Sequence, residues 1–245
     1  MAKPVSQGRS NSTQRIIVSH IEQNLSEIKQ RMQHACQRSK RDPAEITLIA
    51  VSKNFPADDV RIAYEAGHTQ FGENRWQEAE SKIPLLPQSL QWHYIGSLQR
   101  NKVRKVLPHF CLIHSIDSLR LATYTNELAK ELGLFPRVLL QVNLAGELSK
   151  GGFSAEELYQ DAAALLQLER LEICGLMTVP PAVEDPEQAR KWFRGVRELR
   201  DQIESLHSVT LPVLSMGMSG DFEVAIEEGA THIRVGTSIF GRRQY

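Results

Sequence analysis

Apolar residues recur along this 245-residue chain with two alternating periods, and each period predicts one type of secondary structure. From Ile17 to Cys36 they follow at steps of three and four residues, which predicts one long amphipathic helix ending near residues 38–43. Short apolar runs then alternate with further helical patterns. Eight of these runs predict strands, at residues 46–53, 69–74, 90–96, 110–117, 137–144, 171–179, 211–217 and 232–240.

Capping and turn residues indicate where the helices between these strands begin and end. Pro56 and the acidic turn after it open one helix, and Gly67 suits the left-handed residue just past its C-terminus. Ser154 and Glu157 have the spacing of a capping box. Residues 185–188 open another helix, whose predicted apolar face comprises Ala189, Trp192, Phe193, Val196, Leu199, Ile203 and Leu206.

The alternation of eight strands with helices predicts a single (β/α)₈ TIM barrel. Several strands are apolar on both faces, as covered parallel strands must be. We expect the barrel domain over residues 14–245, with the long helix as an N-terminal addition, and a flexible tail over residues 1–13. A doubly wound open sheet is the alternative, but the first strand–helix turn lacks a G-x-G-x-x-G motif.

The charge balance argues against a general attraction to nucleic acids or anionic membranes. Lysine plus arginine and aspartate plus glutamate number 29 each, and the basic residues 99–106 are interpreted as the solvated face of a short helix. No apolar stretch reaches about 18 residues and the polar start lacks a signal-peptide core, so we expect a cytoplasmic protein. The three cysteines lie without metal-ligand spacing, and Cys111 and Cys174 are predicted to be core residues in a reducing compartment.

Candidate chemistry gathers at the C-terminal ends of the predicted strands, the edge at which α/β barrels carry their functional residues. Lys53 ends the first strand, directly after a run of apolar residues. Such a lysine usually extends into solvent, and sequence position alone favours that interpretation. If the barrel instead holds the amine over its mouth with a lowered pKa, the neutral amine can form a Schiff base with an aldehyde.

Two loops rich in glycine and hydroxyl groups favour a phosphate site. They follow the seventh and eighth strands, where α/β barrels commonly bind phosphate. The first loop contains Ser215 and Ser219, and the second contains Gly236 and Thr237. Backbone N–H groups and hydroxyls in such loops can hold a dianion without a lysine. Ordinary capping and turn roles for the same residues are the alternative.

Arg234 lies two residues before Gly236, so the two positions share one face of the last strand. On an inward face its guanidinium must meet an acceptor in the pocket, and a salt bridge with an acidic residue of the barrel, such as Glu73, is the alternative. A lysine, a pair of phosphate loops and an arginine between them outline a pyridoxal phosphate site, in which arginine can be the partner of the pyridine nitrogen. Asn74 and His93 also lie near strand ends, and a structural role is the alternative for His93.

Several segments together resemble the YggS/PROSC family, the pyridoxal phosphate homeostasis proteins. The resemblance covers residues 15–243 and rests on motifs in the family's order, namely IAVSK, FGENR, WHYIGSLQRNK, IHSID, QVN, GLM, LSMGMS-D and IRVGTSIFG. It implies a barrel like the N-terminal domain of bacterial alanine racemase, with pyridoxal phosphate held as an internal aldimine on Lys53 and with Arg234 facing the pyridine nitrogen. The other cofactor contacts that it implies are the phosphate ligands Ser215, Ser219, Gly236 and Thr237 and the neighbours Asn74, His93 and Met218.

The same resemblance bears on catalysis. An alanine racemase needs a second base, normally a tyrosine, and a C-terminal β-domain, whereas this sequence stops four residues after Gly241. An arginine at the pyridine nitrogen also makes the ring a poorer electron sink. We therefore expect a non-catalytic monomer that buffers pyridoxal phosphate or delivers it transiently to cofactor-dependent apoenzymes, affecting amino-acid and keto-acid metabolism, with neither membrane nor nucleic acid as a partner.

Two alternatives to a cofactor carrier stay open from the sequence. The first is a monomeric fold-type III enzyme, a racemase or decarboxylase of amino acids, which would turn its substrate over. The second is a module for nucleic acid or protein, which would bind through the basic residues Arg100, Lys102, Arg104 and Lys105.

Overall fold

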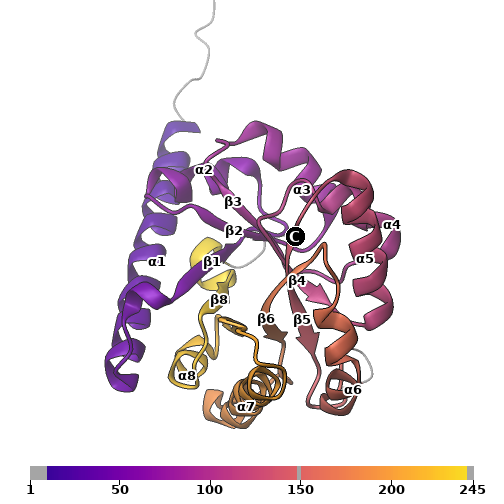
Figure 1. Cartoon of the computed structure of the whole chain (residues 1–245). Helices are drawn as coiled ribbons and strands as arrows, with labels where there is room; N and C mark the ends of the chain where they lie inside the picture. Colours follow the sequence, from indigo (N-terminus) through magenta and orange to yellow (C-terminus); the bar gives the residue numbers. More distant parts are fainter. Residues whose placement is uncertain (1–9, 148–149, 242–245) are drawn as a thin grey trace, which may run out of the picture.

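The computed structural model describes residues 10–147 and 150–241. Its eight strands are all parallel and pair with one another in chain order, and β8 pairs with β1 to close the barrel. Helices surround the closed sheet (Figure 1). The predicted (β/α)₈ barrel with an additional N-terminal helix is therefore confirmed.

The elements lie close to the predicted runs. The strands are β1 Thr47–Val51, β2 Gln70–Glu73, β3 Gln91–Tyr94, β4 Leu112–Ile116, β5 Arg137–Val142, β6 Glu172–Thr178, β7 Val213–Met218 and β8 His232–Val235. The α-helices are α1 Ser10–Ser39, α2 Ala57–Glu65, α3 Trp76–Lys82, α4 Arg100–Val106, α5 Leu119–Leu132, α6 Ala155–Leu166, α7 Arg190–His207, α8 Phe222–Glu227 and α9 Thr237–Phe240. Short 3₁₀ helices are η1 Pro43–Glu45, η2 Ile83–Leu85 and η3 Pro186–Ala189.

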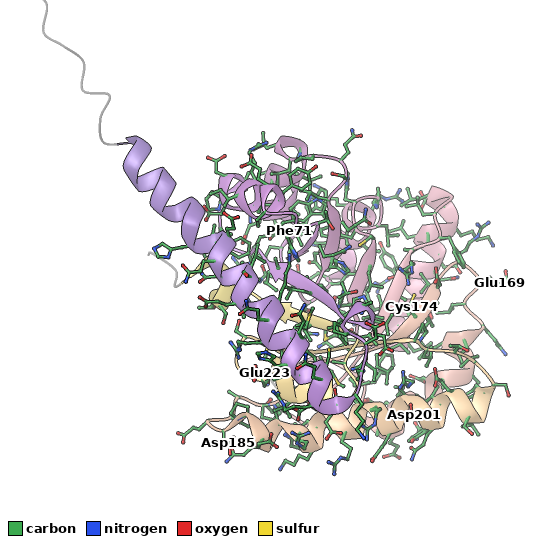
Figure 2. All side chains as sticks on the ribbon, turned by 90° about the vertical axis from the view of Figure 1, so that its left-hand side faces the viewer. Phe71, Glu169, Cys174, Asp185, Asp201 and Glu223 are labelled. Atoms are coloured by element: carbon green, nitrogen blue, oxygen red, sulfur yellow. The ribbon has the colours of Figure 1, made fainter. Side chains whose placement is uncertain are left out.

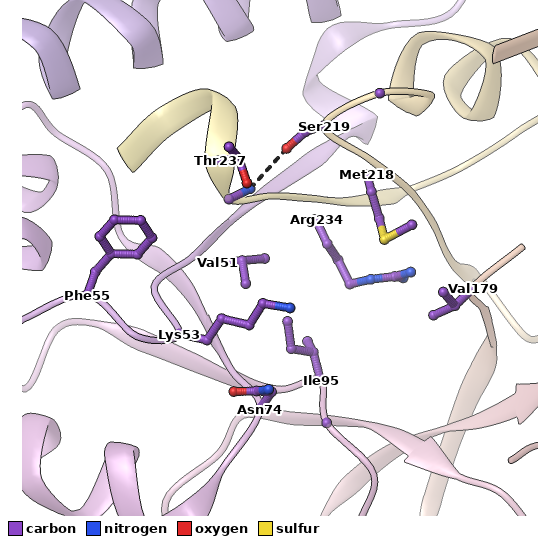
Figure 3. Close-up of a pocket in the computed structure, with 13 residues that line it drawn as sticks. Val51, Lys53, Phe55, Asn74, Ile95, Val179, Met218, Ser219, Arg234 and Thr237 are labelled. Carbon is purple, nitrogen blue, oxygen red and sulfur yellow. Dashed lines mark hydrogen bonds between the residues drawn. The ribbon is translucent and has the colours of Figure 1, made fainter. Parts of the chain in front are cut away.

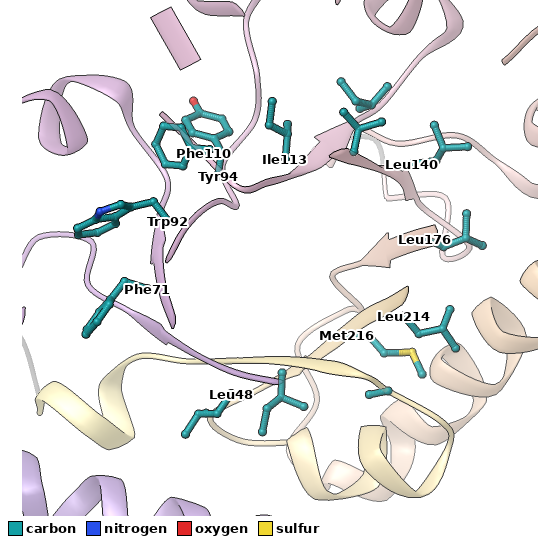
Figure 4. Packing of buried hydrophobic residues seen from close by; sticks show 14 of the residues in the cluster. Leu48, Phe71, Trp92, Tyr94, Phe110, Ile113, Leu140, Leu176, Leu214 and Met216 are labelled. Atoms are coloured by element: carbon teal, nitrogen blue, oxygen red, sulfur yellow. The ribbon is translucent and has the colours of Figure 1, made fainter. Parts of the chain in front are cut away.

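The strands carry apolar side chains on both faces, because alternate residues point to the surrounding helices and into the barrel. The main core lies between strands and helices and includes Leu48, Phe71, Trp92 and Leu176 (Figure 4). A smaller apolar cluster takes residues from β4 to β7 and is separate from the main core, so it lies on the inner face of the barrel. Its members are Leu112, Leu139, Cys174, Met177 and Val213.

The long helix α1 packs against the two short helices that follow β7 and β8. Its buried residues Ile21 and Leu25 belong to the main core. Asn24 Nδ2 donates to Ile239 O of α9 at 2.8 Å. Just beyond α1, Arg41 Nη1 donates to Ile226 O of α8 at 2.9 Å and to Ala230 O, after α8, at 2.7 Å. In Figure 2, α1 crosses this side of the barrel and its first turns extend beyond it. The helix therefore fastens the two ends of the described chain together.

The predicted caps are confirmed. The predicted end of the last strand is wrong, and so is the inclusion of Leu206 in the buried face of α7. Gly67 has a φ of 80° just beyond α2, and Ser154 with Glu157 forms a complete capping box on α6. The last strand ends at Val235 because residues 237–240 turn into the short helix α9. On α7, Leu206 is 67% exposed, because it lies in the last turn, after the core contacts of that face have ended.

The N-terminal helix begins at Ser10, so residues 10–13 of the predicted tail are helical. The remainder of that tail, residues 1–9, lies outside the described residues. Across the described ranges, no helix combines the length and the apolar character needed to cross a membrane.

The three cysteines all carry free thiols, and each is buried or half-buried. Cys174 belongs to the inner apolar cluster and Cys111 packs against it, which suits the predicted core roles. In the part of the chain that the structure describes, no group of histidine, cysteine and acidic residues has the arrangement of a metal site.

Candidate functional site

A cavity of about 430 Å³ opens at the C-terminal ends of the strands, and we call it the mouth pocket. Its volume is in the range of small-molecule sites. Its polar side chains are Lys53, Asn74, Ser219, Arg234 and Thr237, and the rest of its lining consists of Val51, Phe55, Ile95, Gly96, Val179, Met218, Gly220 and Gly236 (Figure 3). The pocket thus brings together all the site residues predicted from the sequence except His93 and Ser215.

Lys53 follows β1 and extends into the mouth pocket (Figure 3). Two side chains of α3 hold the backbone on either side of it. Lys82 Nζ donates to Ser52 O at 2.8 Å, and Asn54 N donates to Glu78 Oε2 at 2.7 Å. Asn54 has a φ of 65°, a left-handed conformation that asparagine tolerates better than most residues. The turn that carries the amine is therefore fixed from both directions.

A buried ion pair lies behind this turn, on the outer side of β2. Glu73 Oε1 accepts hydrogen bonds from Lys82 Nζ at 2.8 Å and from Ser52 Oγ at 2.6 Å. Burial raises the pKa of the Glu73 carboxyl, and the charge of Lys82 opposes that rise. The partner of Glu73 is therefore Lys82, and the alternative of a salt bridge between Glu73 and Arg234 is wrong.

The loops after β7 and β8 are joined at the mouth pocket. Gly236 N donates to Ser219 Oγ at 3.3 Å (Figure 3), and Met218 N donates to Asp221 Oδ1 at 2.6 Å. A Cβ atom at Gly236 would lie 3.2 Å from a backbone oxygen of β1, so a glycine allows the closest approach here. The arrangement places the hydroxyls of Ser219 and Thr237 beside each other at one side of the pocket (Figure 3).

An ion-pair network holds α8, the helix that follows the first of these loops. Glu223 and Glu227 pair with Arg31 and Arg38 of α1 at 3.0 and 2.7 Å. Buried Glu228 receives three guanidinium groups from α7 at 2.9 to 3.1 Å, namely those of Arg190, Arg194 and Arg197. Single exposed pairs contribute little, but a network around a buried carboxylate fixes the position of a helix more firmly.

Arg234 is a buried guanidinium at the inner wall of the mouth pocket. Its Nη1 donates to Ser215 Oγ at 2.6 Å, and its Nη2 donates to Thr178 O at 2.8 Å. Burial lowers the pKa of Arg234 to about 10, and Asp221 opposes the shift. The group therefore stays protonated at neutral pH, and among the described residues no carboxylate forms an ion pair with it.

His93 and Ser215 lie inside the barrel rather than on the pocket lining. Ser215 reaches the pocket only through Arg234, and His93 hydrogen-bonds to His114 at 3.0 Å and to Gln70 at 2.9 Å. Sequence reasoning missed His114 and Gln70. The period-two alternation of β2 and β4 was the available signal, because it places both residues on the inner face.

These interior imidazoles are neutral near pH 7. Burial lowers the pKa of His93 to about 3 and that of His232 to about 4, and it holds the pKa of His114 well below its ordinary value. A neutral imidazole has one donor and one acceptor nitrogen, so each ring can accept one hydrogen bond and donate another.

Comparison with known proteins agrees with this geometry. The chain matches the family described as alanine racemase, N-terminal domain, over residues 16–244. The pyridoxal phosphate homeostasis protein of Aquifex aeolicus is 44% identical over 224 residues, which are 91% of this chain and 98% of that protein.

Solved structures show the same fold. PipY of Synechococcus elongatus, determined with pyridoxal phosphate bound, is 40% identical with a TM-score of 0.80, covering 90% of this chain and 100% of PipY. Alanine racemase of Clostridium difficile has a TM-score of 0.73 over 93% of this chain and 58% of that enzyme. At 14% identity, that second likeness concerns the fold alone.

Removal of Lys82 is expected to destabilise the protein strongly. Lys82→Met leaves the Glu73 carboxylate buried without its cation, which costs about 3–5 kcal/mol of the free energy of unfolding. The double variant Lys82→Met/Glu73→Leu should recover most of that loss, and urea unfolding measures both. Arg104→Met, which breaks an exposed pair with Glu131, is the control and should change little. A double variant as unstable as the single one would contradict the assignment.

Acid is expected to destabilise the fold through its buried histidines. Between the unfolded-state pKa near 6.5 and the folded-state pKa of about 4 for His232, the unfolded chain binds a proton that the folded chain excludes. The free energy of unfolding should fall as the pH is lowered through this window, by about 1.4 kcal/mol per pH unit for each such histidine. His232→Met should reduce that slope by about one histidine's share, as followed by urea unfolding at stepped pH. An unchanged slope in His232→Met would refute the explanation.

Proposed function

The chain belongs to the alanine racemase N-terminal domain family and, among its members, to the pyridoxal phosphate homeostasis proteins, and we propose that it holds pyridoxal 5′-phosphate on Lys53 and maintains the cellular supply of that cofactor. One observation carries the proposal. A single pocket of about 430 Å³ combines a lysine amine, two loops with hydroxyl groups and a buried guanidinium.

The residues of the mouth pocket fit the cofactor. Lys53 supplies the primary amine, and Ser219 and Thr237 offer hydroxyl donors beside the backbone of Gly220. Asn74 carries a buried Oδ1 atom that has no hydrogen-bond partner in the described structure. Buried polar atoms are normally hydrogen-bonded, so this oxygen is available to accept a hydrogen bond from a ligand. Apolar lining residues give the faces of an aromatic ring surfaces to pack on.

Pyridoxal phosphate, when bound, supplies an aldehyde that condenses reversibly with an amine. The part of this chain is to bind and orient the group. Arg234 keeps its proton at neutral pH, so a ring atom that faces it acts as an acceptor and stays unprotonated. We propose Ser219, Gly236 and Thr237 as the phosphate ligands, with Asn74 and Met218 as neighbours of the ring.

The lining of the pocket favours a carrier over a catalyst. Among its described lining residues there is no tyrosine, histidine, cysteine or acidic side chain to serve as a second acid or base beside Lys53. An arginine opposite the ring also weakens the ring as an electron sink. We propose that the protein stores pyridoxal phosphate and releases it to dependent apoenzymes through transient contacts, as a monomer in the cytoplasm, a compartment in which its free thiols would stay reduced.

Purified protein should absorb visible light after addition of pyridoxal phosphate, and borohydride should fix the cofactor irreversibly to one peptide. Mass spectrometry of the digested protein should place the label on Lys53. Lys53→Ala should abolish both the visible band and the label, whereas Lys102→Ala, which alters a lysine outside the mouth pocket, should retain them. A protein that stays colourless, or a label on another residue, would refute the assignment.

The carrier role predicts negligible turnover of amino acids. Protein loaded with pyridoxal phosphate should not exchange the α-protons of single L-amino acids in deuterated water at enzymatic rates, as followed by NMR. An alanine racemase at equal concentration serves as the positive control. Exchange at a rate that Lys53→Ala abolishes would favour the alternative of a monomeric enzyme.

A further inference from the structure

A chain of buried polar side chains crosses the barrel interior beneath the mouth pocket. It starts at Arg234 of β8 and passes to Ser215 of β7 at 2.6 Å, then to His114 of β4 at 2.8 Å. It continues to His93 of β3 at 3.0 Å and reaches Gln70 of β2 at 2.9 Å. The mouth pocket contains only the first of these five side chains. Gln70 instead lines a separate cavity with the residues that begin β1, at the opposite end of the barrel.

The chemistry of the members gives this chain one direction. A guanidinium only donates, so Ser215 Oγ accepts from Arg234 and donates its own hydrogen bond to His114 Nδ1. His114 must then carry its hydrogen on Nε2, which donates to His93 Nδ1. His93 in turn carries its hydrogen on Nε2 and donates to Gln70 Oε1, which ends the series. The Ser215 hydroxyl and the ring N–H groups of His114 and His93 each have an acceptor when the hydrogen bonds run from Arg234 to Gln70.

The opposite direction does not satisfy the same groups. Ser215 Oγ would accept from both Arg234 and His114, and its hydroxyl proton would have no acceptor among the described hydrogen bonds although the group is buried. His232 is no alternative member, because it meets both imidazoles through ring contacts and its Nδ1 lies on Thr231 at 3.0 Å.

We propose that His114, acting through Ser215, is the positioning residue for Arg234 and sets which N–H groups this guanidinium presents to the mouth pocket. Its acceptor nitrogen orients the Ser215 hydroxyl, which then holds Arg234 Nη1, while Thr178 O holds Nη2. Arg234 lines the mouth pocket, and these two bonds leave its other N–H groups without an acceptor among the described hydrogen bonds. This inference rests on the proposed function, in which those N–H groups face the ring nitrogen of pyridoxal phosphate.

The first experiment reads the direction of the chain without requiring the cofactor. Long-range proton–nitrogen correlation spectra of the full-length protein, labelled with nitrogen-15 at histidine, show which ring nitrogen carries the hydrogen. We expect His93 and His114 to be neutral at pH 7 with their hydrogens on Nε2, and we expect Ser215→Ala to shift the Nδ1 signal of His114. A hydrogen on Nδ1 of His114 in the unaltered protein would overturn the proposal.

The second experiment tests the consequence for binding with a matched pair of variants. In His114→Asn an amide oxygen can occupy the place of Nδ1 and still accept from Ser215, whereas His114→Leu offers no acceptor. Both are titrated with pyridoxal phosphate and with a carbocyclic analogue in which a C–H group replaces the ring nitrogen. His114→Leu should weaken binding of pyridoxal phosphate by about tenfold and that of the analogue by less than about twofold. His114→Asn should stay within about threefold of the unaltered protein for both ligands.

The outcomes separate a positioning role from a structural one. Equal losses for both ligands in His114→Leu would mean a general disturbance of the pocket and would overturn the proposal, as would unchanged affinities. If His114→Leu does not fold by circular dichroism, Ser215→Ala breaks the chain at its next member and should show the same selective loss. Failure of the unaltered protein to bind either ligand would refute the proposed function itself, whereas normal binding with an insensitive His114→Leu refutes only this inference.

Discussion

Closure of the sheet between β1 and β8 is the constraint on which the rest of the molecule depends. The pairing of Thr47 to Ala50 with His232 to Val235 leaves no free strand edge and brings all eight carboxyl ends to one rim. Lys53 and Arg234 come from the two strands that meet there, so their shared pocket is a direct product of the closure. The ion pairs of α8 and the hydrogen bond from Asn24 then hold the helices behind the closing strands.

The interior of the barrel also accommodates a buried permanent charge, the guanidinium of Arg234. Arg234 has no carboxylate partner in the described structure, and it is accommodated by neutral acceptors, a serine hydroxyl and a backbone carbonyl. The imidazoles below it are uncharged for the same reason, since another cation in this space would be costly. Because no carboxylate of the described residues forms an ion pair with Arg234, its charge is available to a ligand of the mouth pocket.

Periodicity predicted the elements of this fold well because every strand is covered on both faces and every helix on one. The order of strand ends around the rim follows from chain order alone, and this is why Lys53 and Arg234 could be assigned to one mouth. Depth along a strand could not be predicted in the same way. His93 precedes the rim by two residues, and only the register between neighbouring strands places it below the pocket. The end of β8 was missed because residues 237–240 are rich in β-branched and aromatic types that favour strands, yet they form a turn of helix.

The contact between α1 and α9 has a consequence for biosynthesis. Asn24 and its partner Ile239 are 215 residues apart in sequence. The paired strands β1 and β8 are separated by almost as much of the chain. A nascent chain therefore exposes Lys53 for most of its translation while the loops and the guanidinium that complete the site do not yet exist. A ligand of the mouth pocket therefore cannot act as a template for the early stages of folding. Only a chain whose last strand has left the ribosome can form the complete pocket and bind such a ligand.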